Sequence, residues 1–205
     1  LKKSRHAYPQ KQPLVITESL FSMEGTTAPI KEISKLCIKY DSKLLIDEAH
    51  AFGIMGPEGR GESFGLTEPT SIISGTFGKA FGSGGAFLAT DKITGENLIQ
   101  NCGAFRYTTA LAPPLCASAL AALNLIQSNP SWGSELKEKA IAFRDRLSQL
   151  GWQRPVGEGP IISIILGSDE LAIDYQKRLE AQGLLTVAIR PPTVPEGKSR
   201  LRLVI

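Results

Sequence analysis

The hydrophobic pattern of the first 90 residues predicts strands that alternate with a helix. Residues 13–18 and 44–47 have strand length and consist of an apolar run with a polar end, as found in strands buried on both faces of a parallel sheet. Between them, residues 29–40 repeat their apolar positions at helical spacing and follow a proline that suits a first turn. Two more strands are expected at residues 71–75 and 85–89. This order predicts a βαβ unit whose loops gather at the carboxyl ends of its strands.

The pattern changes in the second half of the chain, where helices come first and strands follow. Residues 105–109 are expected to be extended or a loop. The expected helices are 96–101, 113–127, 131–150 and 169–182, and the expected strands are 161–166, 184–189 and 200–205. We therefore predict an α/β large domain with a mostly parallel sheet over residues 1–130. A linking helix over 131–150 and a small α+β domain over 151–205 would follow.

Composition narrows the function classes. The chain has 205 residues, of which 42% are hydrophobic and 21% charged, and its net charge of +3 includes no basic block that would indicate nucleic-acid binding. The most apolar window, residues 110–126, contains prolines and polar residues, so it predicts a core helix and not a membrane span. Residues 51–69 form a long glycine-rich loop, a length that is usually functional or disordered.

The cysteines and histidines do not have the spacing of a metal site. Cys37, Cys102 and Cys116 are odd in number and lie far apart, so we expect buried, reduced thiols and a cytoplasmic location. Two histidines and scattered carboxylates give no ligand pattern.

A lysine stands in the glycine-rich stretch that follows the third predicted strand. Residues 75–85 place Lys79 among five glycines and two phenylalanines. These neighbours offer little to hydrate an ammonium group, and a poorly hydrated lysine more readily becomes the amine that attacks a carbonyl to form a Schiff base. A glycine-rich turn with a surface lysine is the alternative, and this stretch alone leaves both open.

An acidic pair ends the second predicted strand. Asp47 and Glu48 follow an apolar run, and His50 lies three residues after Asp47. A carboxylate here can pair with a protonated ring nitrogen and a histidine can contact a cofactor ring, although a loop ion pair and a structural histidine are the bland alternatives. Pyridoxal phosphate (PLP) needs a Schiff-base lysine and an acid at its pyridine nitrogen. Lys79 and Asp47 together therefore predict a PLP site.

The sequence Asp-Glu-Ala-His at 47–50 also matches a magnesium-site motif of helicase-type ATPases. Such an enzyme needs a phosphate loop G-x-x-x-x-G-K-[ST] upstream of that motif. Here Lys79 follows the acidic motif, Ala80 stands where Ser or Thr is required, and Ile73 stands where the first glycine is required. The pattern therefore disfavours an ATPase.

Further polar positions suit an anionic ligand. Ser74 and Thr76 precede Lys79 and can bind a phosphate group, although such residues are equally common in turns. Arg190 is followed by two prolines, so its guanidinium can fork onto a substrate carboxylate. Without further context, an exposed loop arginine is the favoured alternative.

Six segments, taken in order, resemble the α-oxoamine synthases, PLP enzymes of the aspartate-aminotransferase fold (fold type I). The segments are 18–25, 46–50, 59–61, 75–79, 107–114 and 188–195. Each is weak alone, but together they are specific and cover nearly the whole chain. Departures from the usual family pattern are Ser19, where glycine is common, and Ala112.

The resemblance implies a decarboxylative condensation of an amino acid with an acyl thioester. Segments 75–79, 107–114 and 188–195 are most similar to family members of biotin synthesis that condense L-alanine with pimeloyl-CoA or pimeloyl-acyl carrier protein. Another α-oxoamine synthase, such as a glycine C-acetyltransferase, and a catalytically inactive truncated homologue are the alternatives.

By position, the resemblance assigns the catalytic roles to Lys79, Asp47 and His50. Lys79 would hold PLP and take the Cα proton of alanine, and Asp47 would pair with the pyridine nitrogen. His50 and Ser22 would contact the ring oxygen, and Thr76 the phosphate.

The resemblance also assigns residues outside the cofactor ring. Arg190 and Thr193 would lie on the substrate side, with Arg190 as the carboxylate partner. Thr108 and Thr109 resemble a segment that reaches the cofactor of the neighbouring subunit, which implies a homodimer.

Family members carry about half of the large domain before the position of residue 1, including a phosphate loop and a histidine that stacks on the ring. No residue before Pro13 matches either feature. We therefore expect a C-terminal portion of such an enzyme, or a truncated homologue, with little synthase activity by itself.

Overall fold

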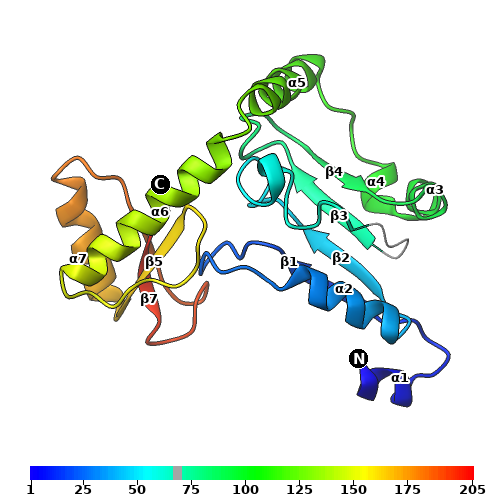
Figure 1. Ribbon diagram of the computed structural model, residues 1–205, viewed down its shortest axis with the longest axis horizontal. Coiled ribbons are helices and arrows are strands. Elements are labelled where there is room, and N and C mark those ends of the chain that lie inside the picture. The colour runs from blue at the N-terminus through cyan, green and yellow to red at the C-terminus, as the bar shows by residue number, and fades with distance from the viewer. Residues whose placement is uncertain (67–70) are drawn as a thin grey trace. The chain divides into compact units, whose positions relative to one another are not determined.

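The computed structural model describes residues 1–66 and 71–205, which form two compact units (Figure 1). The first unit comprises Leu1–Leu20 and Ala28–Ser134, and the second comprises Phe21–Thr27 and Glu135–Ile205. Nothing in the hydrophobic pattern predicts that the short segment 21–27 packs with the C-terminal unit.

The first unit is built on a four-stranded sheet in the order β1-β2-β3-β4. The strands are β1 (Leu14–Glu18), β2 (Lys43–Asp47), β3 (Ser71–Thr76) and β4 (Ala86–Ala89). β1, β2 and β3 are parallel, and β4 returns antiparallel to β3. The predicted α/β class with a mostly parallel sheet is confirmed.

Helix α2 (Ile30–Lys39) connects β1 to β2 and packs on one face of the sheet. The buried cluster at this contact joins two helix residues, Ile30 and Cys37, to the strand residues Leu44 and Ile46. These strand residues alternate with less buried neighbours, as the two faces of a strand require. Burial raises the pKa of the Cys37 thiol.

Helix α5 (Pro113–Ser128) behaves differently from its sequence prediction. It forms as expected, but Ala119 is the one residue of this helix that is buried. Leu115, Leu120, Leu123 and Leu125 are 38–59% exposed, so the prediction of a core helix is wrong for the described chain. No helix among the described residues is long and apolar enough to cross a membrane.

The remaining helices of the first unit include corrections to the sequence prediction. Helix α1 (Lys2–Ala7) was not expected, and α4 (Gly103–Arg106) includes two residues that were expected to be extended or a loop. Helix α3 (Lys92–Asn101) begins at Asp91, whose carboxylate accepts a 2.9 Å hydrogen bond from the backbone N–H of Thr94. Hydrogen bonding with the side chain and then the backbone of Thr94 holds the pKa of Asp91 below its ordinary value.

Of the three cysteines, only Cys37 is buried. Cys102 is partly buried and Cys116 is exposed, so the expectation of three buried thiols is wrong for these two. The predicted loop over residues 51–69 contains a short 3-10 helix, Pro57–Gly59, and its last three residues lie outside the described residues.

The second unit contains a three-stranded antiparallel sheet in the order β5-β7-β6. Its strands are β5 (Ile161–Gly167), β6 (Val187–Ile189) and β7 (Ser199–Val204). Its helices are α6 (Trp132–Gln149), whose first residues belong to the first unit, and α7 (Asp169–Glu180). The predicted small α+β arrangement is confirmed.

Candidate functional site

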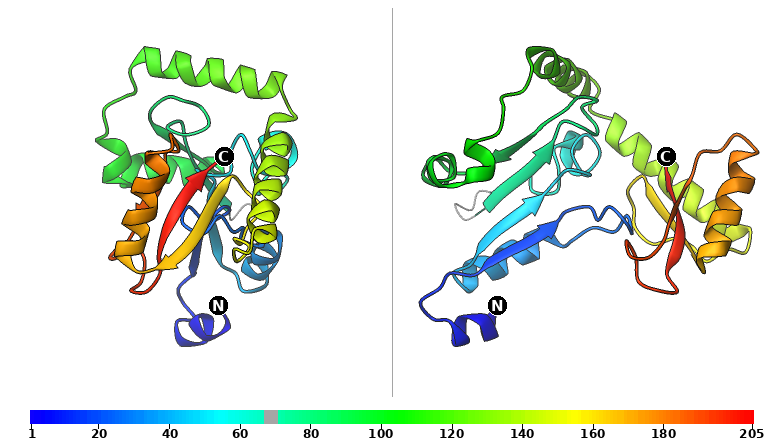
Figure 2. Two further views of the ribbon diagram at one scale, coloured as in Figure 1. Left: turned by 90° about the vertical axis from the view of Figure 1, so that its left-hand side faces the viewer. Right: turned by 180° about the vertical axis from the view of Figure 1, so that it is seen from behind.

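The polar residues that the sequence singles out lie at one edge of the first sheet. Since β1, β2 and β3 are parallel, their carboxyl ends at Glu18, Asp47 and Thr76 lie together (Figure 2). Open α/β sheets bind ligands at this edge. The fold therefore places Asp47 and the stretch leading to Lys79 on neighbouring strands.

The Asp47 carboxylate is held by two hydrogen bonds. Oδ1 accepts from the backbone N–H of Ala49 at 2.8 Å, and Oδ2 accepts from Ser74 Oγ at 3.2 Å. The second bond crosses from β2 to β3, where the two residues are direct register partners. Asp47 is thus fixed in direction and is only partly buried.

Glu48, the next residue, is fully buried. Its carboxylate accepts hydrogen bonds from Ser19 Oγ at 2.5 Å and from the Ser63 backbone N–H at 2.6 Å. A buried carboxylate is tolerated only when it is bonded in this way. Glu48 therefore ties the end of β1 and the loop after β2 to the strand that carries Asp47.

The motif Gly59-Arg60-Gly61 has a structural explanation in the same loop. Gly61 has a φ of +87°, and a Cβ there would lie 2.8 Å from the Glu48 carboxyl carbon. Only glycine permits both this backbone conformation and this approach. Arg60 points away to a 2.7 Å ion pair with Glu58, so the motif shapes the loop around Glu48.

Lys79 lies in the loop that joins β3 to β4, as the sequence predicts from its position after a strand. The Thr76 hydroxyl closes this loop, because it donates to the Gly85 carbonyl at 3.1 Å and accepts from the Gly78 N–H at 3.1 Å. The Gly82 N–H donates to the Lys79 carbonyl at 2.9 Å. Lys79 itself is exposed, so the expectation of a poorly hydrated ammonium is wrong for the described chain.

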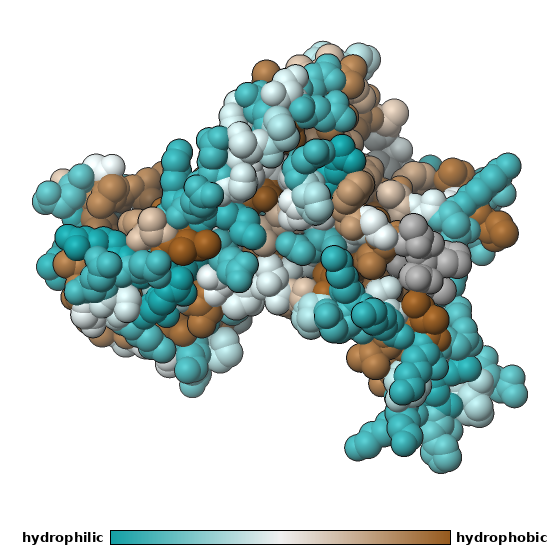
Figure 3. Space-filling view, in the orientation of Figure 1, coloured by the Kyte–Doolittle hydropathy of each residue, from teal (hydrophilic) through white to brown (hydrophobic). Residues whose placement is uncertain are grey.

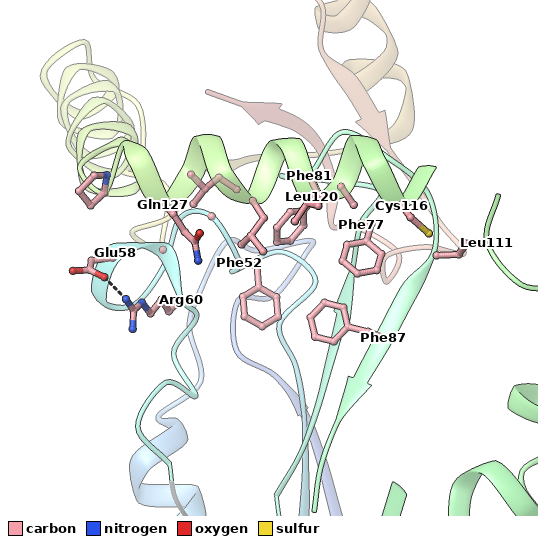
Figure 4. A pocket seen from close by; sticks show the side chains of 16 residues that line it. Phe52, Glu58, Arg60, Phe77, Phe81, Phe87, Leu111, Cys116, Leu120 and Gln127 are labelled. Atoms are coloured by element: carbon pink, nitrogen blue, oxygen red, sulfur yellow. Dashed lines mark ion pairs between the residues drawn. The ribbon is translucent and has the colours of Figure 1, made fainter. Parts of the chain in front are cut away.

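Aromatic rings fill one side of the lysine loop. Phe77 contacts Phe81 edge to face at 5.6 Å between centroids and Phe87 at 5.2 Å. Together with Phe52 they line an apolar hollow of about 970 Å³ below α5 (Figure 4). Apolar surface over this region of the first unit is visible in Figure 3.

The hollow does not suit an anionic cofactor. Its charged lining residues, Glu58 and Arg60, are paired with each other, and none of the predicted site residues belongs to its described lining. The polar groups that could hold PLP lie instead at the carboxyl edge of the sheet.

The other predicted residues of the first unit lie on turns. His50 is partly buried in the turn that follows β2. Thr108 and Thr109 are exposed between α4 and α5, and the Thr108 hydroxyl donates to the Ala104 carbonyl at 2.5 Å. An exposed position is compatible with a contact to another subunit.

Ser22, Arg190 and Thr193 belong to the second unit. The Ser22 carbonyl accepts a 2.8 Å hydrogen bond from Arg202 Nε. Arg190 follows β6 directly and is exposed, and its carbonyl accepts from the Thr193 N–H at 3.0 Å.

The structure thus brings Asp47 on β2 into contact with Ser74 on β3. Lys79 lies in the loop that follows β3. Sequence reasoning missed the buried Glu48 with its partners Ser19 and Ser63. The acidic pair at the end of β2 is a signal for such a residue. Successive side chains of a strand point to opposite faces, so when one of two adjacent carboxylates faces the ligand edge, the other must find a partner inside the protein.

Comparison with known proteins agrees with this geometry. All 205 residues, 1–205, match the family described as aminotransferase class I and II. The chain belongs to this family. The resemblance to the α-oxoamine synthases within it is confirmed by the relatives that follow.

Among similar curated sequences, a putative 8-amino-7-oxononanoate synthase from Acetivibrio thermocellus is 42% identical over 200 residues, covering 97% of this chain and 52% of the relative. An 8-amino-7-oxononanoate synthase from Methylobacillus flagellatus is 40% identical, covering 94% of this chain and 49% of the relative. The chain therefore spans about half the length of the curated relatives it matches.

Solved structures give the same fold. A serine palmitoyltransferase from S. paucimobilis with a bound PLP–myriocin aldimine superposes with a TM-score of 0.87 at 29% identity, covering 96% of this chain and 50% of that one. An 8-amino-7-oxononanoate synthase from Francisella tularensis gives 0.80 at 26% identity, covering 100% of this chain and 60% of that one. The predicted fold type I architecture is confirmed.

Proposed function

We propose that this chain carries the lysine half of the active site of a PLP-dependent acyltransferase of the 8-amino-7-oxononanoate synthase type. One observation supports this most directly: an oriented carboxylate, Asp47, ends one strand, and the neighbouring strand leads into the loop that carries Lys79. The names of two similar relatives, each an 8-amino-7-oxononanoate synthase or a putative one, support the same activity.

The residues present fit PLP. Asp47 is an oriented carboxylate that can pair with a protonated pyridine nitrogen, and Lys79 is exposed, so its amine can bond the aldehyde carbon. Thr76 ends β3, and its hydroxyl would exchange its bond to the Gly85 carbonyl for one to the phosphate. Ser74 is engaged with Asp47, so we assign it to orienting the carboxylate and not to the phosphate. His50 and Ser22 would contact the ring oxygen.

PLP, when bound, supplies an electron sink for the carbon atom next to the amino group of the substrate. In the proposed reaction, the Cα of L-alanine forms a bond with the thioester carbonyl carbon of pimeloyl-CoA or pimeloyl-acyl carrier protein. The thiol carrier and CO2 leave. Lys79 would move the proton at Cα, and Arg190, with Thr193, would hold the substrate carboxylate.

One observation favours a second candidate, a chain that binds PLP without turnover: Lys79 is exposed. Catalysis depends on binding energy that positions the reacting bond, so a lysine that stays solvated should cost rate as well as affinity. The proposed synthase would be a homodimer, in which Thr108 and Thr109 reach the cofactor of the neighbouring subunit. We also propose a cytoplasmic location for it.

The test begins with the cofactor. The purified chain is mixed with PLP, reduced with borohydride and digested, and the modified peptide is identified by mass spectrometry. We expect a phosphopyridoxyl group on Lys79, no labelling in Lys79→Ala, and unchanged labelling in Lys92→Ala, a matched exposed lysine. Labelling spread over several surface lysines would contradict the proposal.

Turnover is measured separately by supplying L-alanine and pimeloyl-CoA and following CO2 and free thiol. We expect little or no product from this chain. Activity comparable to a full-length synthase would show that the residues present are sufficient. Product from glycine and acetyl-CoA only would favour the glycine C-acetyltransferase alternative.

A further inference from the structure

The second unit contains a cavity of its own. It has a volume of about 400 Å³ and is lined by residues of the three-stranded sheet, of helices α6 and α7, and of the segments that join them. All of the lining residues lie within residues 135–205, so the second unit alone forms this cavity. Asp47 and Lys79 of the candidate site belong to the first unit.

The two helices supply apolar side chains through their periodicity. Phe143 and Leu147 are four residues apart on α6 and both line the cavity. Tyr175 and Leu179 have the same spacing on α7 and line it as well. Residues four positions apart lie on the same side of a helix, so each helix turns one apolar pair toward the cavity.

The sheet supplies further apolar side chains from one of its faces. Leu201 on β7 is the register partner of Ile164 on β5, so the two side chains lie on the same face. Leu203 lies two residues further along β7 and therefore also on this face. Arg200 and Arg202 alternate with the leucines, so the face that lines the cavity carries no arginine of this strand.

One small polar side chain interrupts this apolar lining. Thr186 directly precedes β6, belongs to the lining and is only 3% exposed. Its hydroxyl has no hydrogen-bond partner among the residues that the structure describes. A buried hydroxyl without a partner costs free energy, and such groups are uncommon in folded proteins. A ligand that hydrogen-bonds Thr186 would remove this cost.

The lining also restricts the charge of such a ligand. No lysine, arginine, aspartate or glutamate belongs to the described lining of this cavity. Arg178 packs on the Tyr175 ring but lies outside the lining, and it pairs with Asp174 at 3.4 Å. An ionised head group would lose its hydration in the cavity without gaining a partner of opposite charge. We therefore expect a neutral head group.

The size and the opening of the cavity suit an aliphatic chain. Leu184, Leu185 and Val204 belong to its lining and are exposed, so the opening is apolar. An apolar cavity of about 150 Å³ stays dry and binds benzene. The larger volume here leaves room for a chain of several carbon atoms.

We propose that this cavity is a binding site for a neutral, medium-chain aliphatic molecule with one oxygen-containing head group. The chain contacts the leucines of the lining, and the head group forms a hydrogen bond with the Thr186 hydroxyl. This site does not rest on the proposed function, because none of its residues is assigned to PLP or to the substrates of the acyltransferase.

The experiment titrates the 205-residue chain with 8-bromo-octanol in the absence of PLP. Bromine quenches the fluorescence of a nearby tryptophan, and Trp152 belongs to the lining. The chain has a second tryptophan, Trp132, so Trp132→Phe serves as the parent. We expect saturable quenching by one molecule per chain. The charged analogue 8-bromo-octanoate should bind about tenfold more weakly at neutral pH, and equal or tighter binding of this acid would contradict a neutral site.

Thr186→Val tests the hydrogen bond, because it keeps the shape of the side chain and removes the hydroxyl. We expect the ligand-free variant to unfold at the same or a higher temperature than the parent, since an unpartnered buried hydroxyl is gone. Its affinity for 8-bromo-octanol should nevertheless fall about fivefold. Its affinity for 1-bromo-octane, which has no head group, should be unchanged. Equal affinity of Thr186→Val and the parent for 8-bromo-octanol would overturn the assigned contact.

Two leucines provide a matched comparison for the cavity itself. Leu184 and Leu171 are both exposed in the second unit, but only Leu184 belongs to the described lining. We expect Leu184→Ala to bind 8-bromo-octanol several-fold more weakly and Leu171→Ala to bind it like the parent. Quenching that does not saturate, or that weakens equally in both variants, would show adsorption to apolar surface and overturn the site. Labelling of Lys79 by PLP is measured separately, so failure of this site is distinguishable from failure of the proposed function.

Discussion

The acid and the lysine of the candidate site lie on neighbouring strands but in unlike settings. Asp47 is bonded to β3 and to its own turn, and the adjacent Glu48 is fully buried and tied to the end of β1. Lys79 is exposed in a loop that is closed by its own backbone and by Thr76. The difference shows that the sheet itself fixes the acid, whereas the amine remains accessible to an incoming aldehyde.

The largest loss of stability is expected on substitution of Glu48, the buried carboxylate next to Asp47. Glu48→Ala should lower the free energy of unfolding by about 3 kcal/mol, because it removes two hydrogen bonds to a carboxylate and leaves the Ser63 N–H unpaired. Urea denaturation measures this loss. Glu48→Gln keeps an acceptor and should lose about half as much, and an unchanged midpoint for Glu48→Ala would contradict the assigned role.

Removing the hydrogen bond across the strands tests the orientation of the acid. Ser74→Ala should cost about 1 kcal/mol of stability, since one oxygen of Asp47 loses its hydroxyl donor. PLP affinity should fall several-fold in the same variant, because the carboxylate is less well aimed. If stability falls but affinity does not, Ser74 supports the fold alone.

The lysine loop should respond more weakly. Thr76→Val keeps the shape of the side chain but removes both hydrogen bonds that close the loop, in a setting open to water. We expect a loss of about 0.5 kcal/mol or less in thermal unfolding, together with slower labelling of Lys79 by PLP. A loss as large as that of Glu48→Ala would remove the contrast between the two settings.

The smallest expected effect lies outside both regions and depends on pH. The pKa of Asp91 is lowered from its ordinary value of 3.8 by its hydrogen bonds with Thr94, so its cap on α3 stabilises the folded chain above that pH. The contribution is lost as the pH falls through the lowered pKa. Asp91→Ala should therefore be slightly less stable than the parent near neutral pH, with the gap closing on acidification. A gap that widens in acid would contradict this sign.

Much of this architecture follows from local pattern. The strand-length apolar runs and the amphipathic spacing of residues 29–40 fix the βαβ unit, because each element buries its apolar side against the next. The site follows in part for the same reason, since Asp47 ends one predicted strand and Lys79 lies in the stretch that follows the next one.

What the pattern cannot show is which apolar or charged side chains find a partner. Helix α5 is apolar in sequence, yet all four of its leucines are exposed, because burial depends on what packs against a helix and not on its composition. An acidic pair at a strand end signals one buried carboxylate, but the partners of Glu48 and the Arg202 contact with Ser22 are distant in sequence, so no local rule predicts these partners.

The protonation state of bound PLP tests the central claim, that Asp47 and Lys79 serve one cofactor. PLP labelled with ¹⁵N in its ring is bound to the chain, and the ring nitrogen is observed by NMR in the parent and in Asp47→Ala. We predict a protonated ring nitrogen in the parent and a neutral one in the variant. Borohydride reduction should still attach PLP to Lys79 in both proteins. The same nitrogen shift in both proteins would show that Asp47 does not contact the cofactor held by Lys79.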